Sequence, residues 1–258
     1  MEQTTMFDNK AEQPLASRLR PERLEEFVGQ KHLIGEGKVL RRLIESDHIS
    51  SMLFWGPPGV GKTTLARIIA NRTKATFIDF SAVTSGIKEI KTVMQRAENN
   101  RRFGEKTIVF VDEIHRFNKA QQDAFLPFVE KGSIILIGAT TENPSFEVNG
   151  ALLSRSRIFE LKPLEKEDIK ALIQKAVYDR EKGMGAYGAD ISEEAADFLA
   201  DAAGGDARAA LNAVELGVLT TPKGADGKIH LTFEVASECI QKRAVSYDKE
   251  GDNHYDTV

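Results

Sequence analysis

The amino-acid sequence predicts an α/β fold with a mainly parallel sheet, followed by a smaller all-helical unit. A glycine-rich octet, GPPGVGKT at residues 56–63, separates a short apolar run from a stretch with helical spacing. Apolar runs then alternate with helical stretches up to about residue 163, where strand signals stop. This alternation is typical of a parallel sheet with helices on both faces.

The octet fits the phosphate-binding loop pattern G-x-x-x-x-G-K-[ST]. Backbone N–H groups can wrap a polyphosphate only where no Cβ intervenes, and the following helix N-terminus favours the anion. We expect Lys62 to reach the β and γ phosphates of a nucleoside triphosphate and the Thr63 hydroxyl to bind Mg²⁺. The alternative is a glycine/proline turn with an incidental lysine. The predicted nucleotide-binding residues of this loop are Gly56, Pro57, Pro58, Gly59, Val60, Gly61, Lys62, Thr63 and Thr64.

The remaining elements follow from the same periodicities. Strand-like runs pair with helical ones as 75–80 with 87–97, 107–111 with 120–129, and 133–139 with 157–161. Helix starts are predicted at Glu165, Ser192, Gly205 and Thr232. Acids lie in the first turn after Glu165, and Ser192 is a capping residue followed by acids. The expected units are a poorly ordered N-terminus 1–13, an α/β nucleotide-binding core 14–163, a helical lid 164–245 and a tail 246–258.

Charge limits the kinds of partner. The 258 residues carry a net charge of −4, which excludes a globally basic nucleic-acid binder. Basic residues are nevertheless in excess up to residue 163 and acidic ones after it, so that, if DNA is a partner, its contacts are expected in the first part. The basic residues Lys88, Lys91, Arg96, Arg101 and Arg102 form a cluster that is either a DNA contact or a solvated helix face.

Composition also predicts a compartment. No apolar run is long enough to cross a bilayer, and the first residues do not form a signal peptide. The lone cysteine, Cys239, allows no internal disulfide and fits a reducing cytosol. The sequence therefore predicts a cytoplasmic protein without a membrane partner, and its expected association with the nucleoid is implied only by a family resemblance of its motifs.

A second half of the site follows the apolar run 107–111. Asp112 and Glu113 end this predicted strand, where consecutive side chains point to different sides. We expect Asp112 to hold Mg²⁺ and Glu113 to orient and polarise the attacking water. The alternative is a solubilising turn. The sequence DEIH also resembles the D-E-x-H box of helicases, but the chain has no second helicase core, and His115 is interpreted as a packing or hydrogen-bonding residue.

Further candidates are two polar side chains after a strand and three arginines. Thr141, with Asn143 in reserve, follows the strand beside the acids and could sense the γ-phosphate. Arg155 and Arg157 lie at the edge of the core, and Arg208 begins a lid helix. A guanidinium suits a developing phosphate charge, although each arginine could instead form a surface ion pair.

Seven segments together resemble the AAA+ ATPases. They are RP at 20–21, FVGQ at 27–30, GPPGVGKT, VDEIHRF at 111–117, GATTENPS at 138–145, LLSRSR at 152–157 and GGDARAALN at 204–212. Within the clamp-loader branch, the chain is most similar to the replication-associated recombination protein A family, relatives of the Werner-helicase-interacting ATPase.

The resemblance assigns residue roles. It implies that Lys62 and Thr63 form the Walker A pair, and that Asp112 and Glu113 form the Walker B pair. Thr141 takes the sensor-1 position. Arg155 corresponds to a finger that enters a neighbouring subunit's site, and Arg208 to the sensor-2 arginine of the lid. The segment with Val28 and Gly29 is implied to flank the adenine.

The resemblance also implies a biological role. Family members are DNA-dependent ATPases of stalled or gapped replication forks, work near single-strand DNA-binding protein and form tetramers. Relatives continue beyond residue 258 into a C-terminal oligomerisation domain, so the chain is expected to be an ATPase-core fragment. A nucleotide-dependent switch or scaffold and a clamp-loader-like subunit are the alternatives.

Overall fold

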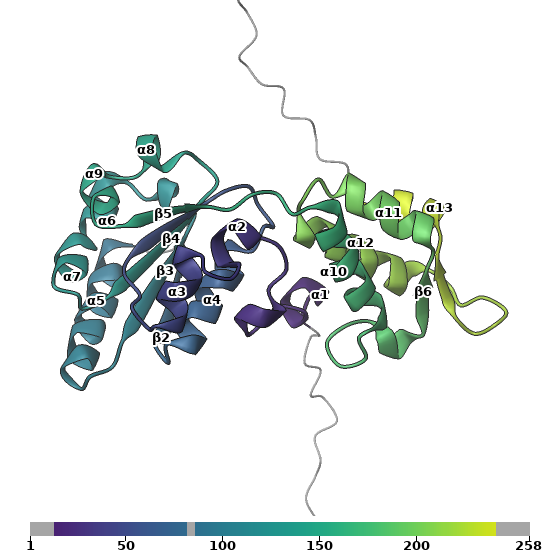
Figure 1. The fold of residues 1–258 in the computed structure, drawn as a ribbon, viewed down its shortest axis with the longest axis horizontal. Coiled ribbons are helices and arrows are strands. Elements are labelled where there is room, and N and C mark those ends of the chain that lie inside the picture. The colour runs from purple at the N-terminus through teal and green to yellow at the C-terminus, as the bar shows by residue number, and fades with distance from the viewer. Residues whose placement is uncertain (1–12, 82–85, 241–258) are drawn as a thin grey trace, which may run out of the picture.

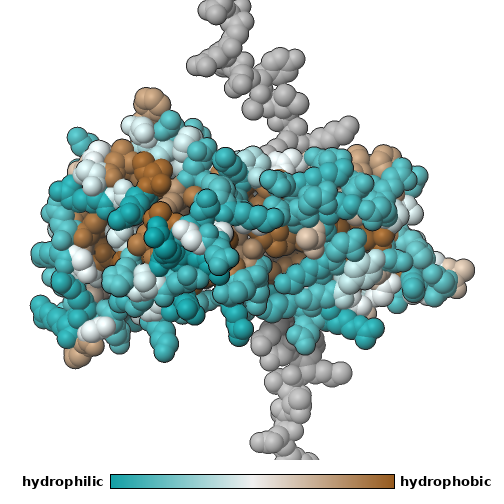
Figure 2. Space-filling model, in the orientation of Figure 1, coloured by the Kyte–Doolittle hydropathy of each residue, from teal (hydrophilic) through white to brown (hydrophobic). Residues whose placement is uncertain are grey.

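The computed structural model describes residues 13–81 and 86–240, which form two units. Figure 1 shows an α/β unit on one side and a mainly helical lid on the other. Hydrophilic side chains cover most of the face in Figure 2, with apolar ones visible over α8 and where the units meet. Within the described residues, no helix is long and apolar enough to cross a bilayer.

The α/β unit is built on a five-stranded sheet in the order β2-β3-β4-β1-β5, and every strand pair is parallel. This confirms the predicted parallel α/β fold. The order makes β4 the neighbour of both β1 and β3, so the carboxyl ends of these three strands meet at one edge. The strands are β1 Met52–Trp55, β2 Thr76–Ser81, β3 Thr107–Asp112, β4 Ile135–Thr140 and β5 Arg157–Glu160.

Helices cover both faces of the sheet because consecutive strand residues point to opposite sides. In β1, Met52 and Phe54 join the apolar cluster under α2, α3 and α4, whereas Leu53 joins the cluster under α5. The helices of this unit are α2 Lys31–Ile34, α3 Val39–Glu45, α4 Lys62–Arg72, α5 Ile87–Arg102, α6 Lys119–Asp123, α7 Leu126–Glu130, α8 Pro144–Glu147 and α9 Gly150–Leu153, with single 3₁₀ turns at Leu24–Glu26 and Ile114–Arg116.

The lid has its own apolar core, which includes Ile173, Leu199 and Val214. Three of its four predicted helix starts are N-caps in the structure, and the fourth, Gly205, precedes the N-cap Asp206. The lid elements are α10 Lys166–Tyr178, a 3₁₀ turn at Gly185–Tyr187, β6 Ala189–Ile191, α11 Glu193–Ala202, α12 Ala207–Thr220, β7 Ile229–Leu231 and α13 Phe233–Cys239.

Three local expectations are corrected. Strands do not stop at residue 163, because β6 and β7 form a parallel pair inside the lid. Each is only three residues long, too short for a periodicity to show. Residues 157–160 form edge strand β5 instead of a helix, and the helix expected over 120–129 is divided between α6 and α7.

Helix α1 (Leu15–Arg18) belongs to the lid by its packing. Leu15 and Leu19 are buried in the lid core, and the backbone N–H of Leu15 donates to Glu215 Oε1 at 2.9 Å. Arg18 donates through Nε to the carbonyl of Lys182 at 3.3 Å. This differs from the sequence-based division, which assigned residues 14–163 to the core, because hydrophobic contacts distant in sequence leave no local signal.

We predict that the turn before α12 is sensitive to a side chain at one glycine and not at its neighbour. Gly205 has φ +81°, and a Cβ there would lie 2.9 Å from the backbone nitrogen of Leu164, which donates to the Gly205 carbonyl. Gly204 has φ +56° and open space around its Cβ position. Both alanine variants should lose about 1 kcal/mol from the positive φ, and Gly205→Ala at least about 1 kcal/mol more from the collision.

Urea unfolding of Gly205→Ala and Gly204→Ala provides the measurement, with Gly204→Ala as the matched control. Equal unfolding free energies for the two variants would show that the Gly205–Leu164 contact does not constrain the lid.

Candidate nucleotide site

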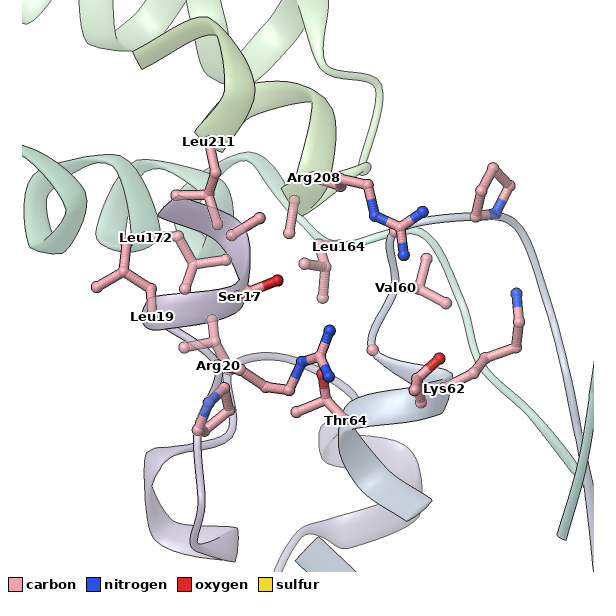
Figure 3. Close-up of a pocket in the computed structure, with 18 of the residues that line it drawn as sticks. Ser17, Leu19, Arg20, Val60, Lys62, Thr64, Leu164, Leu172, Arg208 and Leu211 are labelled. Atoms are coloured by element: carbon pink, nitrogen blue, oxygen red, sulfur yellow. The ribbon is translucent and has the colours of Figure 1, made fainter. Parts of the chain in front are cut away.

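A cavity of about 460 Å³ lies between the α/β unit and the lid, and both units line it. Figure 3 shows side chains from α4, α10, α12 and the segment after α1 around this space. The structure thus brings together residues that the sequence placed in separate motifs. The predicted residues that line the cavity are Val28, Pro58, Gly59, Val60, Gly61, Lys62, Thr63, Thr64, Asp112, Glu113 and Arg208.

The phosphate-binding loop is pressed against the lid. Gly59 has φ +73°, and a Cβ there would lie 1.7 Å from Asp206 Oδ1. The backbone N–H of Ala207 also donates to the Gly59 carbonyl at 3.2 Å. The missing side chain at Gly59 therefore serves the loop–lid contact as well as the bare backbone that a polyphosphate requires.

Lys62 is buried at the first position of α4. Its Nζ donates to the carbonyls of Gly56 at 2.6 Å and Pro57 at 2.8 Å. These two predicted residues do not line the cavity, but their carbonyls hold the Lys62 side chain. Burial lowers the pKa of Lys62, and the nearby carboxylates of Glu113 and Asp112 act in the opposite direction. The lysine and both predicted acids therefore share one electrostatic environment.

The two acids occupy the carboxyl end of β3. The backbone N–H of Glu113 donates to Asp112 Oδ1 at 3.1 Å. Glu113 itself has φ +52° and ψ +47°, a left-handed conformation that is uncommon for a residue with a side chain. This conformation costs of order 1 kcal/mol and turns the chain sharply away from the strand.

The Glu113 carboxylate has two neighbours from the same edge of the sheet. Thr141 Oγ1 donates to Glu113 Oε2 at 3.4 Å, a long and therefore weak hydrogen bond, and His115 Nε2 lies 3.4 Å from the same oxygen. The other ring nitrogen of His115 is 2.9 Å from Oγ1 of the buried Thr140, which bears out the hydrogen-bonding interpretation of this histidine.

Asn143, the reserve candidate for the sensor position, has a different contact. Its side chain accepts the backbone N–H of Ser145 at 3.0 Å and caps α8. Thr141 is therefore the candidate that touches the acid, although it is not among the cavity-lining residues.

The two predicted arginines lie in different places. Arg208, in the first turn of α12, lines the cavity. Arg155 follows α9 outside the cavity lining, where its guanidinium forms an ion pair with Glu130 at 2.6 Å and donates to the Ala151 carbonyl at 2.9 Å. Arg155 thus contributes nothing to the cavity of its own chain.

Of the two residues predicted to flank the adenine, only one lines the cavity. Val28 lines the cavity, whereas Gly29 lies beside Leu164 and Asp168, outside the lining. The donor set for a divalent cation is present: the Thr63 hydroxyl and the Asp112 carboxylate line one cavity, and both are hard oxygen ligands of the kind that Mg²⁺ prefers.

Three residues of the site carried no role in the sequence reasoning beyond membership of a motif. Asp206 caps α12, with Oδ1 accepting the backbone N–H groups of Arg208 at 2.9 Å and Ala209 at 3.1 Å. Arg20 lines the cavity from the segment after α1. Gln30 is buried under the loop. The only available signals were the fragments GGDAR, RP and FVGQ.

A glycine cradle with a buried lysine, a carboxylate pair at a neighbouring strand end and an arginine-bearing lid define a P-loop nucleotide-binding protein. The comparisons with known proteins agree. The family "ATPase family associated with various cellular activities (AAA)" matches residues 52–164, and the "AAA C-terminal domain" matches residues 185–258.

Relatives extend the match along the chain. Replication-associated recombination protein A of Haemophilus influenzae is 52% identical over 95% of the chain and 55% of its own length. ATPase WRNIP1 of Dictyostelium discoideum is 40% identical over 98% of the chain and 31% of its own length. The Thermotoga maritima RuvB Holliday junction branch migration motor has the same fold, with a TM-score of 0.66 at 24% identity over 86% of this chain and 72% of that one.

The chain belongs to the AAA ATPase family, in the group of the replication-associated recombination protein A ATPases. It spans about half the length of the bacterial relatives it matches.

We predict that Gln30 holds the loop and the lid connection together. Its Nε2 donates to the Lys162 carbonyl at 2.7 Å and to the Val60 carbonyl at 3.4 Å, and its Oε1 accepts the Lys162 N–H at 3.0 Å. Gln30→Leu keeps the volume but leaves buried backbone groups unpaired. The free energy of unfolding should fall by about 2–3 kcal/mol.

The exposed Gln95 on α5 provides the control, because Gln95→Leu should change stability by less than about 0.5 kcal/mol. Denaturant unfolding measures both variants, and a Gln30→Leu protein as stable as wild type would contradict the assigned role.

Proposed function

We propose that the chain is the ATPase unit of a DNA-dependent ATPase that acts at stalled or gapped replication forks. One observation carries the ATPase part of this proposal: Lys62, Asp112, Glu113 and the lid residue Arg208 line a single cavity. The replication part is supported by the names of the relatives.

In this proposal the loop and Lys62 bind the phosphates of ATP, and Thr63 with Asp112 hold Mg²⁺. The metal would neutralise phosphate charge during transfer to water. Glu113 would orient that water and accept its proton, while Thr141 steadies the carboxylate from the neighbouring strand. Arg208 would approach the phosphates from the lid, so that binding draws the two units together.

We further propose that Arg155 completes the site of a neighbouring copy. Its exposed ion pair with Glu130, outside the cavity of its own chain, supports this assignment because such a pair contributes little and can exchange. The assembly would be a homo-oligomer, a tetramer in the whole protein, and would act in the cytoplasm with DNA and single-strand DNA-binding protein as partners.

We propose that the DNA contacts lie on the α/β unit. The basic cluster named above lies on α5, and its lysines and arginines are exposed. Exposure suits a phosphate contact and a solvated helix face equally, so the salt dependence of DNA binding in a variant without these charges separates the two.

ATP hydrolysis with and without forked DNA tests the proposed function. We expect forked DNA to raise turnover several-fold in the wild-type protein. Lys62→Ala should lose ATP binding, whereas Glu113→Gln should bind ATP and lose at least about 100-fold in turnover, because only the water-activating group is gone.

Turnover that forked DNA leaves unchanged would favour a nucleotide-dependent switch or scaffold. Loading or release of a sliding clamp by the protein would instead favour a clamp-loader-like subunit. Full turnover in Glu113→Gln would contradict the assigned water-activating group.

A shared active site predicts complementation between two inactive variants. Glu113→Gln lacks the water-activating group and Arg155→Ala lacks the finger, yet a mixed assembly contains interfaces with both wild-type residues. Equal mixing with independent sites should restore roughly a quarter of wild-type turnover.

Arg157→Ala is the matched control, because Arg157 is an exposed neighbour at the start of β5 and its loss should leave turnover near wild type. No recovery in mixtures that native mass spectrometry shows to be mixed assemblies would refute the shared site.

A further inference from the structure

Arg20 places an unpaired positive charge in the cavity. The residue follows α1, is half-buried and lines the cavity together with Thr64 and Arg208. Figure 3 shows its guanidinium pointing into the space between these two residues. Within residues 13–81 and 86–240, no hydrogen bond or ion pair engages the Arg20 side chain.

The acidic groups around Arg20 are already engaged. Asp79 is paired with Arg67 at 2.9 Å, and the Arg67 guanidinium also lies over the Phe77 ring. Glu26, which lines the same cavity, accepts the backbone N–H of Glu22 at 3.2 Å. Burial lowers the pKa of Arg20, and the positive charges of Arg67 and Arg208 lower it further, whereas the carboxylate of Asp79 acts in the opposite direction.

A guanidinium in such surroundings is unfavourable until an anion joins it. Arginine presents its donors as a planar fork that matches phosphate oxygens. The direction of the side chain, the surplus of positive charge and the absence of an internal acceptor in the described residues all point to a phosphate group in this part of the cavity.

Which phosphate it is follows from the neighbouring residues. Lys62, the residue expected at the β and γ phosphates, extends its Nζ to the loop carbonyls of Gly56 and Pro57. Arg20 approaches from the Thr64 side, two residues further along α4 than Lys62. Phosphate-binding loops hold the α and β phosphates on their backbone amides, so the position beside Thr64 suits the phosphate nearest the ribose.

We propose that Arg20 binds the α-phosphate of the nucleotide and is a positioning residue delivered by the N-terminal segment. The inference rests on the proposed nucleotide binding and deepens it. Because α1 packs on α12 and the Leu15 N–H is bonded to Glu215, Arg20 is attached to the lid, as Arg208 is. The lid therefore carries two arginines to the phosphate chain, and the Arg20 contact is made to ATP and ADP alike.

Titration calorimetry of Arg20→Met with ATP and with ADP tests this proposal. Methionine keeps the aliphatic stem and removes the charge. We expect the dissociation constants for both nucleotides to rise by the same factor, about 10- to 100-fold, the effect of one charge-assisted contact. Arg20→Lys should recover part of the loss. Arg23→Met, at an exposed position outside the cavity lining, should bind within about twofold of wild type.

Several outcomes would overturn the proposal. Unchanged affinity in Arg20→Met would exclude the contact. A loss for ATP that is at least about tenfold larger than for ADP would place Arg20 at the γ-phosphate instead. If wild type binds neither nucleotide, the proposed function itself fails, and that result is distinct from a defect confined to the variant. Arg20→Gln is the second variant if Arg20→Met does not fold, as judged by circular dichroism.

Discussion

The contact between Gly59 and Asp206 is the constraint on which the site depends. Asp206 caps α12 through the N–H groups of Arg208 and Ala209, and the same side chain lies where a Cβ of residue 59 would be. One carboxylate therefore fixes both the start of the helix that bears Arg208 and its distance from the phosphate-binding loop. A larger residue at position 59 would separate the lid from the loop and widen the cavity.

The order of the strands brings the predicted catalytic groups of the α/β unit to the phosphate-binding loop. Because β4 lies between β1 and β3, the loop after β1, the acids after β3 and the threonines at the end of β4 meet at one edge. The strained backbone of Glu113 is tolerated there, where Ile114 is buried beside it in the apolar core. The same turn brings His115 to Thr140, and the acid is contacted by His115 from the turn after β3 and by Thr141 from the end of β4.

Sequence reasoning succeeded where the signal is local. The phosphate-binding loop, the acid pair after a buried strand, and helix caps such as Ser192 and Thr232 are contained in short stretches, and the structure has them where the pattern placed them. Sequence reasoning did not predict features that depend on packing between residues far apart in the sequence. Arg20 and Gln30 acquire their roles only because α1 folds onto the lid and Lys162 returns beneath the loop. The three-residue strands β6 and β7 exist only as a pair.

Separate cores explain how nucleotide could control the lid. The lid cluster shares no residue with the two clusters of the α/β unit, and within the described residues few hydrogen bonds join the units, among them the one from Ala207 to Gly59. Because so few contacts join the units, a change in their relative position costs little free energy. A nucleotide that touches the loop, Arg20 and Arg208 adds contacts across this same boundary. If the nucleotide binds as proposed, the free energy of those contacts would favour the closed arrangement, and their loss on product release would permit opening.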